Sequence, residues 1–454
     1  MHAVPRSTVP GSEVPEVECW DVLELDAGAL DGGFAEGTMP SMTFARDGRT
    51  FVSGAFEEGG RYRVRFLPDE PGEWTYTFDA SGSGTFVCTP PSRDNHGPVR
   101  VDGLRFSYAD GTTNVPLGTT AYWWHEQDAD HRKATLTAFT AAGFTKVRMS
   151  VLPAGRAGWP DPGHLAAVER GVRELRDIGV DAELVLFHAG EGSVRARGPD
   201  PGWQGFLRQA VSRLAAYRNV SWCVAANADQ VVAPAEGWDE VVRVVEEYDY
   251  GHHLLTLHGG PLLDFGRRAL THASVRHDQV RIVSALTDSL GKPVVVDSCG
   301  FEGDAQLREA SLTAEEVVVR LWEATCRGGF ASHGEWYTAD DAAPWWSAGG
   351  ALAGAAAARI SFLRTVMDAA PAGLRRRAQE PDASTLELPG VYYLQYYGPH
   401  RFRSRAFTLP AGDYQVAVLD TWNMRVRELP GTFTGTFVLE LPGELYQAVR
   451  IERC

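Results

Sequence analysis

The chain has 454 residues, of which 59 are Asp or Glu and 43 are Lys or Arg, giving a formal net charge of −16 at pH 7. This charge argues against nucleic acid or an anionic membrane surface as a partner, because neutralising phosphates requires clustered basic residues. With 44% hydrophobic and 22% charged residues the composition is that of a globular protein, and the length predicts more than one domain. No segment approaches the roughly 18 consecutive apolar residues of a membrane span.

The first 18 residues, MHAVPRSTVPGSEVPEVE, contain no basic segment followed by an apolar one, so we expect no secretory signal. The six cysteines lie far apart and show no CxxC spacing, which argues against a zinc cage. Free, largely buried thiols in a cytoplasmic protein are the simplest interpretation. We expect neither a cofactor nor a metal ion.

Residues 14–98 show the period-two alternation of half-buried strands. The runs RYRVRF (61–66) and GEWTYTF (72–78) flank a turn rich in Pro and Gly, which indicates an antiparallel hairpin. Several such runs in succession predict a small β-sandwich over 14–98.

Residues 99–378 alternate short apolar strands with amphipathic helices. One helix is expected to begin after Asp161 as N-cap, with Pro162 in its first turn, and to end at Gly179. A second opens with Thr313 and Glu316, the pattern of a capping box. Expected strands begin near Leu117, Thr145, Asp181, Val220, His253, Thr271, Pro293 and Gly329. Eight strands at this spacing favour an α/β fold of the (β/α)8 TIM-barrel type, in which the short step after the fifth strand leaves room for only a small or irregular helix.

Alternation returns in residues 383–454, for example in YQVAVLD (414–420). These residues predict a C-terminal β-sandwich. The exposed strand edges of two sandwiches make a homo-oligomer a possible state.

Functional side chains of a TIM barrel project from the C-terminal ends of its strands. The residues expected there and assigned to substrate binding are Trp123, Trp124, His125, Arg148, His188, Asn227, His258, His272, Ser298, His333, Trp336 and Tyr337. Aromatic faces stack on sugar rings and polar groups bind hydroxyls, so this set indicates a carbohydrate ligand. Taken singly, His188, His258 and His272 fit a structural role equally well. Four strand-end histidines also raise the possibility of a metal site, but their spacing matches no ligand motif.

Several stretches, in order along almost the whole chain, resemble a bacterial group of glycoside hydrolase-like proteins. They include RVRFLPDEPGEWTYTF, LGTTAYWW, GFTKVRMSVLP, YRNVSWCVAAN, KPVVVDSCGFEGD and RGGFASHGEWY. That group combines an N-terminal β-sandwich, an apiosidase-like TIM barrel related to the retaining glycosidases, and a C-terminal β-sandwich. The resemblance implies the same architecture and a carbohydrate ligand here.

The resemblance also implies where catalytic carboxylates would lie. Retaining glycosidases of this class carry an Asn-Glu pair after strand four, with Glu as acid/base, and a nucleophilic Glu after strand seven. Here Ala226 and Asn227 occupy the first pair of positions, and Ser298 occupies the nucleophile position. An amide cannot replace a carboxylic acid as a proton donor, so neither expected carboxylate is present.

Three hypotheses follow. The protein could hydrolyse glycosides with other carboxylates, for which Glu302, Glu335 and Asp229 are the best catalytic candidates, followed by Glu126 and Asp297. It could be a catalytically inactive relative that binds a glycan or a partner protein. It could also be a sugar lyase or isomerase that uses His and Glu as acid and base. Function must be argued from the site, since the fold is shared by many activities.

Overall fold

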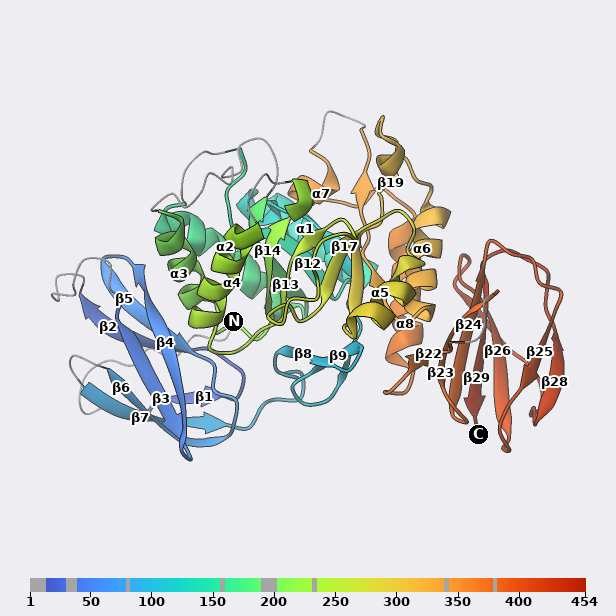
Figure 1. Ribbon diagram of the computed structural model, residues 1–454, viewed down its shortest axis with the longest axis horizontal. Helices are drawn as coiled ribbons and strands as arrows, with labels where there is room; N and C mark the ends of the chain where they lie inside the picture. Colours follow the sequence, from blue (N-terminus) through green and yellow to red (C-terminus); the bar gives the residue numbers. More distant parts are fainter. Residues whose placement is uncertain are drawn as a thin grey trace.

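The computed structural model describes residues 14–29, 39–78, 82–155, 160–188, 202–230, 235–338, 343–378 and 382–454. Residues 1–13, on which the expectation of no secretory signal rests, lie outside these ranges. A central barrel with surrounding helices lies between an N-terminal unit of strands (blue) and a C-terminal unit of strands (red) (Figure 1). Among the described residues, no helix combines the length and the apolar character needed to cross a membrane.

The N-terminal unit is a seven-stranded sheet with the order β1-β7-β6-β3-β4-β5-β2. Its strands are β1 (Glu16–Glu18), β2 (Leu23–Ala29), β3 (Ser41–Arg46), β4 (Arg49–Glu58), β5 (Arg61–Phe66), β6 (Gly72–Phe78) and β7 (Gly82–Thr89). The long strand β4 pairs with β3 over its first half and with β5 over its second half. Phe44 and Phe66, from the two halves of the sheet, stack with ring centroids 4.1 Å apart, so both halves share one core.

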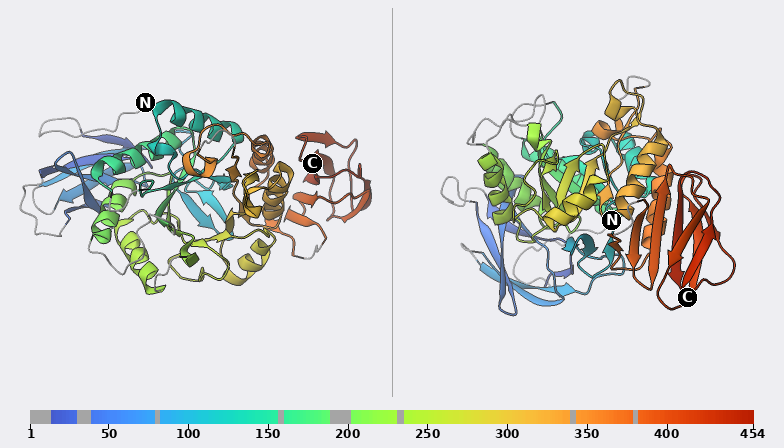
Figure 2. Two further views of the ribbon diagram at one scale, coloured as in Figure 1. Left: turned by 90° about the horizontal axis from the view of Figure 1, so that it is seen from above. Right: turned by 45° about the vertical axis from the view of Figure 1, so that its right-hand side comes forward.

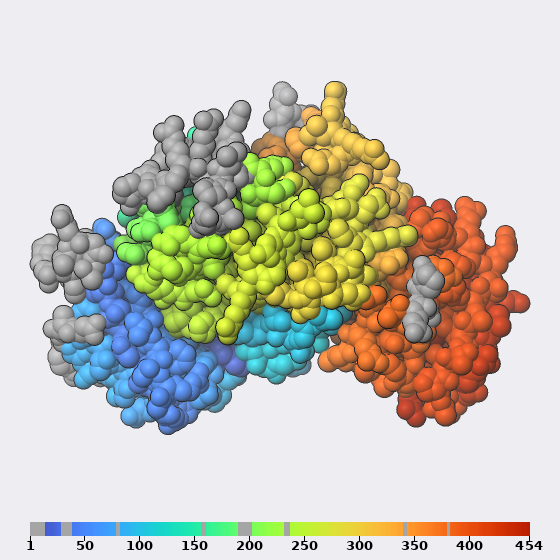
Figure 3. All heavy atoms as spheres, viewed as in Figure 1, coloured from blue at the N-terminus to red at the C-terminus, as the bar shows by residue number. Residues whose placement is uncertain are grey.

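A small three-stranded sheet follows, made of β8 (Val99–Asp102), β9 (Arg105–Tyr108) and β10 (Thr113–Asn114). In the space-filling view this segment (cyan) lies beneath the barrel (Figure 3). Phe106 of β9 contacts His272 edge to face, and both line a small space at the N-terminal ends of the barrel strands. The segment therefore covers the end of the barrel opposite the expected site.

The eight barrel strands expected from the sequence are confirmed. They are β11 (Gly118–Thr120), β12 (Lys146–Ser150), β13 (Asp181–His188), β14 (Val220–Ala226), β15 (Leu255–Thr256) with β16 (His258–Gly259), β17 (Ala273–Arg276), β18 (Val294–Ser298) and β20 (Phe330–Ala331). All neighbours are parallel, and the fifth strand is divided into β15 and β16. A bridge between Thr119 and His333 joins the first strand to the eighth and closes the TIM barrel (Figure 2).

Helices cover the barrel between successive strands. They are α1 (Ala129–Ala142), α2 (Pro162–Asp177), α3 (Trp203–Leu214), α4 (Ala235–Tyr248), α5 (Ile282–Leu290), α6 (Ala314–Cys326), α7 (Trp345–Ala348) and α8 (Ala356–Asp368), with the single-turn 3-10 helices η1 (Trp124–Glu126), η2 (Ala228–Gln230) and η3 (Arg308–Ala310). The predicted caps are confirmed, since Asp161 accepts a bond from the His164 N–H at 2.9 Å and Thr313 from the Glu316 N–H at 3.2 Å. Residues 260–272, after the fifth strand, contain turns and no helix.

The C-terminal unit contains a six-stranded sheet with the order β22-β23-β24-β29-β26-β27 and a two-stranded sheet, β25-β28. Its strands are β22 (Arg375–Arg376), β23 (Ser384–Leu388), β24 (Tyr392–Gly398), β25 (Ser404–Thr408), β26 (Tyr414–Asp420), β27 (Arg425–Glu428), β28 (Thr436–Glu440) and β29 (Gln447–Arg453). The unit packs on α6, where Trp322 stacks on Tyr396 at 5.4 Å. The six cysteines are free, as expected, and Cys454 is the exposed one.

Candidate functional site at the C-terminal face of the barrel

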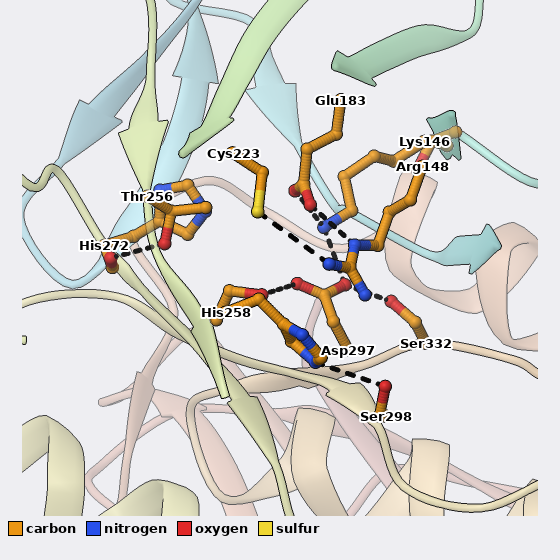
Figure 4. A network of polar contacts seen from close by, with 12 residues as sticks. Lys146, Arg148, Glu183, Cys223, Thr256, His258, His272, Asp297, Ser298 and Ser332 are labelled. Atoms are coloured by element: carbon orange, nitrogen blue, oxygen red, sulfur yellow. Dashed lines mark hydrogen bonds and ion pairs between the residues drawn. The ribbon is translucent and has the colours of Figure 1, made fainter. Parts of the chain in front are cut away.

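The barrel interior holds a compact ion network (Figure 4). Lys146 donates to Glu183 at 2.9 Å and to Asp297 at 2.7 Å, and Arg148 donates to Glu183 at 2.7 Å. Burial by itself would raise the pKa of Asp297, but the Lys146 ammonium and the Arg148 guanidinium hold that pKa far below its usual range. Asp297 is thus a fixed anion paired with Lys146, beside Glu183, which pairs with both cations, and this is not the state of a general acid.

His258, on the fifth strand, connects the ends of the fourth and seventh strands. Its Nδ1 lies 3.2 Å from the backbone nitrogen of Asn227, and its Nε2 lies 3.2 Å from the Ser298 hydroxyl. Burial lowers the pKa of His258 well below its usual value, so the imidazole is neutral. A backbone N–H can only donate, so Nδ1 is the acceptor and Nε2 carries the proton. His258 therefore donates to Ser298 and cannot serve as its base.

Asn227 adopts the left-handed backbone conformation, with φ at 53°. Asn tolerates this region much better than Glu does. Its side-chain oxygen accepts a 2.7 Å bond from Arg276, at the end of β17, and Arg276 also pairs with Asp229 at 2.8 Å. The backbone at the end of strand four therefore favours asparagine over glutamate at position 227. The charge of the candidate catalytic residue Asp229 is neutralised by the Arg276 guanidinium.

Glu302 and Glu335, the other two catalytic candidates, lie side by side on the short paired strands β19 (Glu302–Gly303) and β21 (Glu335–Trp336). Carboxylate oxygens of the two residues approach within 4.8 Å. Each carboxylate accepts two backbone N–H groups from residues 353–356, at 2.6 to 3.0 Å, immediately before and at the start of α8. Helix α8 begins at Ala356, and these glutamates hold the loop that precedes it.

The surroundings of this pair are closed. Glu302 is 2% exposed and Glu335 is 3% exposed. A Cβ atom on Gly354 would lie within 2.5 Å of the Glu302 carboxylate, so the backbone packs directly on it. Burial raises the pKa of Glu335, and the neighbouring Glu302 adds to this effect. The pair stabilises the N-terminus of α8, and no space for a sugar ring separates the two carboxylates.

A row of partly exposed aromatic side chains follows the same face of the barrel. Tyr122 lies edge to face with His188 at 4.5 Å and with Trp346 at 6.3 Å, and Trp346 lies 5.6 Å from Trp336. Trp123 extends the row, 5.7 Å from His188. Tyr122 packs against Val185, Cys223 and Ala226, so the row begins beside the end of the fourth strand, and its rings offer flat apolar faces there.

Four predicted binding residues lie elsewhere. His272 precedes β17, so it lies at the N-terminal end of the barrel, where it contacts Phe106. Trp124 and His125 are fully buried behind the rim, where Trp124 packs on Phe139 of α1. The ring of His333 lies 5.2 Å from that of Phe144, and one of its nitrogens lies within 4.8 Å of carboxylate oxygens of Glu302 and Glu335. Trp124 and His125 lie on the 3-10 helix η1, which turns both side chains into the core, and His272 precedes its strand instead of following it.

Arg148 is another residue whose expected position changes, since it lies inside the barrel with no exposed surface. Three residues at the face were not predicted, namely Tyr122, Arg276 and Trp346. Arg276 ends the sixth strand, β17, and the sequence would have indicated it had the end of that strand been placed correctly. No local signal indicates Trp346, because it lies on α7, more than two hundred residues along the chain from Tyr122. Tyr337 lies at the face and donates to Glu302 at 3.2 Å.

Comparisons with known proteins cover both the flanking units and the whole chain. The family model DUF5060, a domain of unknown function, matches residues 16–81, and DUF5605, also a domain of unknown function, matches residues 382–452. No curated protein matches the chain. Among solved structures, a protein from Bacteroides vulgatus ATCC 8482 named "putative glycoside hydrolase" is 28% identical, with a TM-score of 0.89 over 97% of this chain and 100% of that chain. The resemblance to this group is confirmed.

Two more distant structures support the glycoside hydrolase-like fold. A glycoside hydrolase family 5 protein from the same organism is 14% identical, with a TM-score of 0.63 over 80% of this chain and 94% of that chain. Another protein, named glycoside hydrolase, is 12% identical, with a TM-score of 0.62 over 79% of this chain and 97% of that chain. At such identities the likeness shows the fold alone, and the fold is a TIM barrel.

Proposed function

We propose that this chain is a carbohydrate-active protein that binds a glycan at the C-terminal face of its barrel and lacks the catalytic pair of the retaining glycosidases. One observation carries the proposal. The neutral ring of His258 hydrogen-bonds to both positions that would hold that pair, Asn227 and Ser298. Retaining hydrolysis needs one carboxylate to attack the anomeric carbon and a second to protonate the leaving oxygen.

The aromatic row supports glycan binding. Tyr122, Trp123, Trp336 and Trp346 are partly exposed and continue across the rim. Loss of one stacking ring is expected to weaken binding by about tenfold, or ~1.4 kcal/mol. Trp346→Ala is the matched test. Trp422→Ala, in the C-terminal unit against Arg359, is the control because it changes the same residue type outside the aromatic row.

Hydrolysis with displaced carboxylates is a second candidate, favoured by one observation. Glu302 and Glu335 approach within 4.8 Å, and the raised pKa of Glu335 is the property of a general acid. A panel of oligosaccharides and aryl glycosides, read by mass spectrometry and by calorimetry, separates the two functions. Saturable binding without any product supports glycan binding without hydrolysis. Product release that Glu335→Gln abolishes, while Glu246→Gln on the exposed face of α4 does not, contradicts it.

We further propose the domain bounds 14–98, 99–378 and 383–454, with a β-sandwich on each side of the barrel. The two family models that match the flanking units support this division. The shared core of the two halves of the N-terminal sheet also supports it. Limited proteolysis followed by mass spectrometry tests the bounds, since cleavage near residues 98 and 380 is expected and early cleavage inside a barrel strand would contradict them.

A further inference from the structure

Beside the aromatic row, a cluster of two histidines and one glutamate joins the segment after the first strand to helix α2. His125 and Glu126 lie on η1, and His164 lies in the first turn of α2. One ring nitrogen of each histidine and one carboxylate oxygen of Glu126 lie within 4.8 Å of one another. None of these residues has a part in the glycan-binding proposal.

The hydrogen bonds of His164 determine which of its nitrogens faces the cluster. Its Nε2 lies 2.9 Å from the backbone oxygen of Val151, which can only accept. Nε2 therefore donates to Val151, and Nδ1 is the nitrogen that faces the cluster, 4.0 Å from Glu126 Oε1. Metal-ligating histidines commonly donate one ring N–H to a backbone carbonyl and bind the ion through the other nitrogen.

His125 supplies an independent observation. Its side chain is fully buried, and neither of its ring nitrogens has a hydrogen-bond partner among the residues that the structure describes. Leaving a buried polar atom unsatisfied costs about 1–3 kcal/mol. Its ring lies 6.1 Å from that of His164. Gly171 of α2 makes this position possible, because a Cβ there would lie 2.9 Å from the Cβ of His125.

Two ring nitrogens and one carboxylate oxygen converge in this cluster. The Ala154 N–H donates to Glu126 Oε1 at 3.2 Å and positions the carboxylate beside the two rings.

We propose that His125, Glu126 and His164 form a binding site for a divalent transition-metal ion, with Zn²⁺ the best match. Two imidazole nitrogens and one carboxylate oxygen are a known zinc ligand set that leaves a fourth position for water. Tetrahedral bonds of about 2.0–2.1 Å place ligand atoms about 3.4 Å apart, so the three side chains close by roughly 1 Å around the ion. Glu126 and His164 are partly exposed, which allows this movement.

The ion would fix the rim of the proposed binding face. It links η1, which follows Tyr122 and Trp123, to the start of α2. Zinc binding should therefore stabilise the fold and order the first part of the aromatic row. This role is independent of whether the protein binds or hydrolyses a glycan.

The test uses the full chain, freed of metal by a chelator and titrated with Zn²⁺ in a calorimeter. We expect one high-affinity Zn²⁺ per chain, a raised Tm, and a d–d absorption band of tetrahedral type when Co²⁺ replaces Zn²⁺. Glu126→Gln and His164→Gln should each weaken binding by about ten- to a hundredfold. Both positions are partly exposed, so these variants should keep the fold, and circular dichroism checks this.

Glu246→Gln and His277→Gln are matched controls, because each changes the same residue type on another part of the surface. They should bind Zn²⁺ with the affinity of the unaltered chain. Absence of stoichiometric binding at micromolar Zn²⁺ would overturn the proposal. Binding that persists unchanged in both Glu126→Gln and His164→Gln would also overturn it, because the ion would then lie elsewhere.

Discussion

The hydroxyl of Ser298 and Nε2 of His258 lie 3.2 Å apart, with the proton on the histidine. In a serine hydrolase the corresponding histidine nitrogen is unprotonated and takes the serine proton. Here the backbone N–H of Asn227 occupies the other ring nitrogen and fixes the opposite tautomer. The pair has the residues and the distance of a nucleophilic dyad, but Nε2 of His258 carries a proton and cannot accept the one on the Ser298 hydroxyl.

We therefore expect Ser298 to be inert toward a fluorophosphonate probe. Without a base, the serine hydroxyl is a weak nucleophile. Incubation of the chain with the probe, followed by intact-mass analysis, should show no adduct. Ser298→Ala provides the blank. An adduct on the unaltered chain that is missing from Ser298→Ala would show that His258 can adopt the other tautomer.

The backbone at Asn227 leads to a second prediction. Asn227→Ala and Asn227→Gly both remove the bond to Arg276, and they differ only in their tolerance of the left-handed conformation. Asn227→Ala should be less stable than Asn227→Gly by about 1 kcal/mol in the free energy of unfolding. Urea denaturation measures the difference. Equal stabilities would mean that the backbone relaxes, and that a glutamate at this position faces no conformational barrier.

Glu302 should act mainly in stability. Its carboxylate accepts the N–H groups of Ala355 and Ala356, and Glu302→Gln exchanges one of its two acceptor oxygens for an NH₂ group. A loss of about 1–3 kcal/mol is expected, because one buried N–H is left without an acceptor. Thermal and urea unfolding should show this loss in Glu302→Gln and less than 0.5 kcal/mol in Glu246→Gln, which is about the usual size for a surface change. A Glu302→Gln chain with unchanged stability would free the residue for a catalytic assignment.

Buried histidines should make the fold sensitive to mild acid. Burial lowers the pKa of His258, of His272 to about 4, and of His333 to about 3. Because the folded-state pKa values lie below the unfolded value of about 6.5, protonation favours the unfolded chain. The contribution of these neutral histidines to the free energy of unfolding is complete above pH 6.5. It falls as the pH drops toward 4, by up to about 1.4 kcal/mol per pH unit for each histidine. Glu335, whose pKa is raised, offsets part of this loss.

Urea denaturation at pH 8, 6.5, 5.5 and 5 measures the effect. The free energy of unfolding should be nearly constant between pH 8 and 6.5 and should decrease below pH 6.5. The slope of the free energy of unfolding against pH reports the number of protons taken up on unfolding. His272→Gln should lower that number by about one, since one titrating group is removed. A stability that does not change between pH 7 and 5 would mean that these rings bind protons in the folded chain as they do in the unfolded one.

The sequence determined the architecture because its signals are local. Alternation in runs such as 61–66 predicted antiparallel strands, and caps such as Asp161 and Thr313 marked helix starts that the structure confirms. The spacing of eight apolar runs predicted a barrel, since parallel strands need a helical crossover between them. The absence of glutamate at positions 227 and 298 was also visible in the sequence.

Only the tertiary structure decided what the site residues do. Glu302 and Glu335 looked available for catalysis, but their partners are backbone N–H groups of residues 353–356, far along the chain. Trp346 reaches Tyr122 from a distant helix. The protonation of His258 depends on an N–H from one strand and a hydroxyl from another. Periodicity records which face of an element a residue occupies, whereas hydrogen-bond partners and proton positions depend on side chains that meet only after the barrel closes.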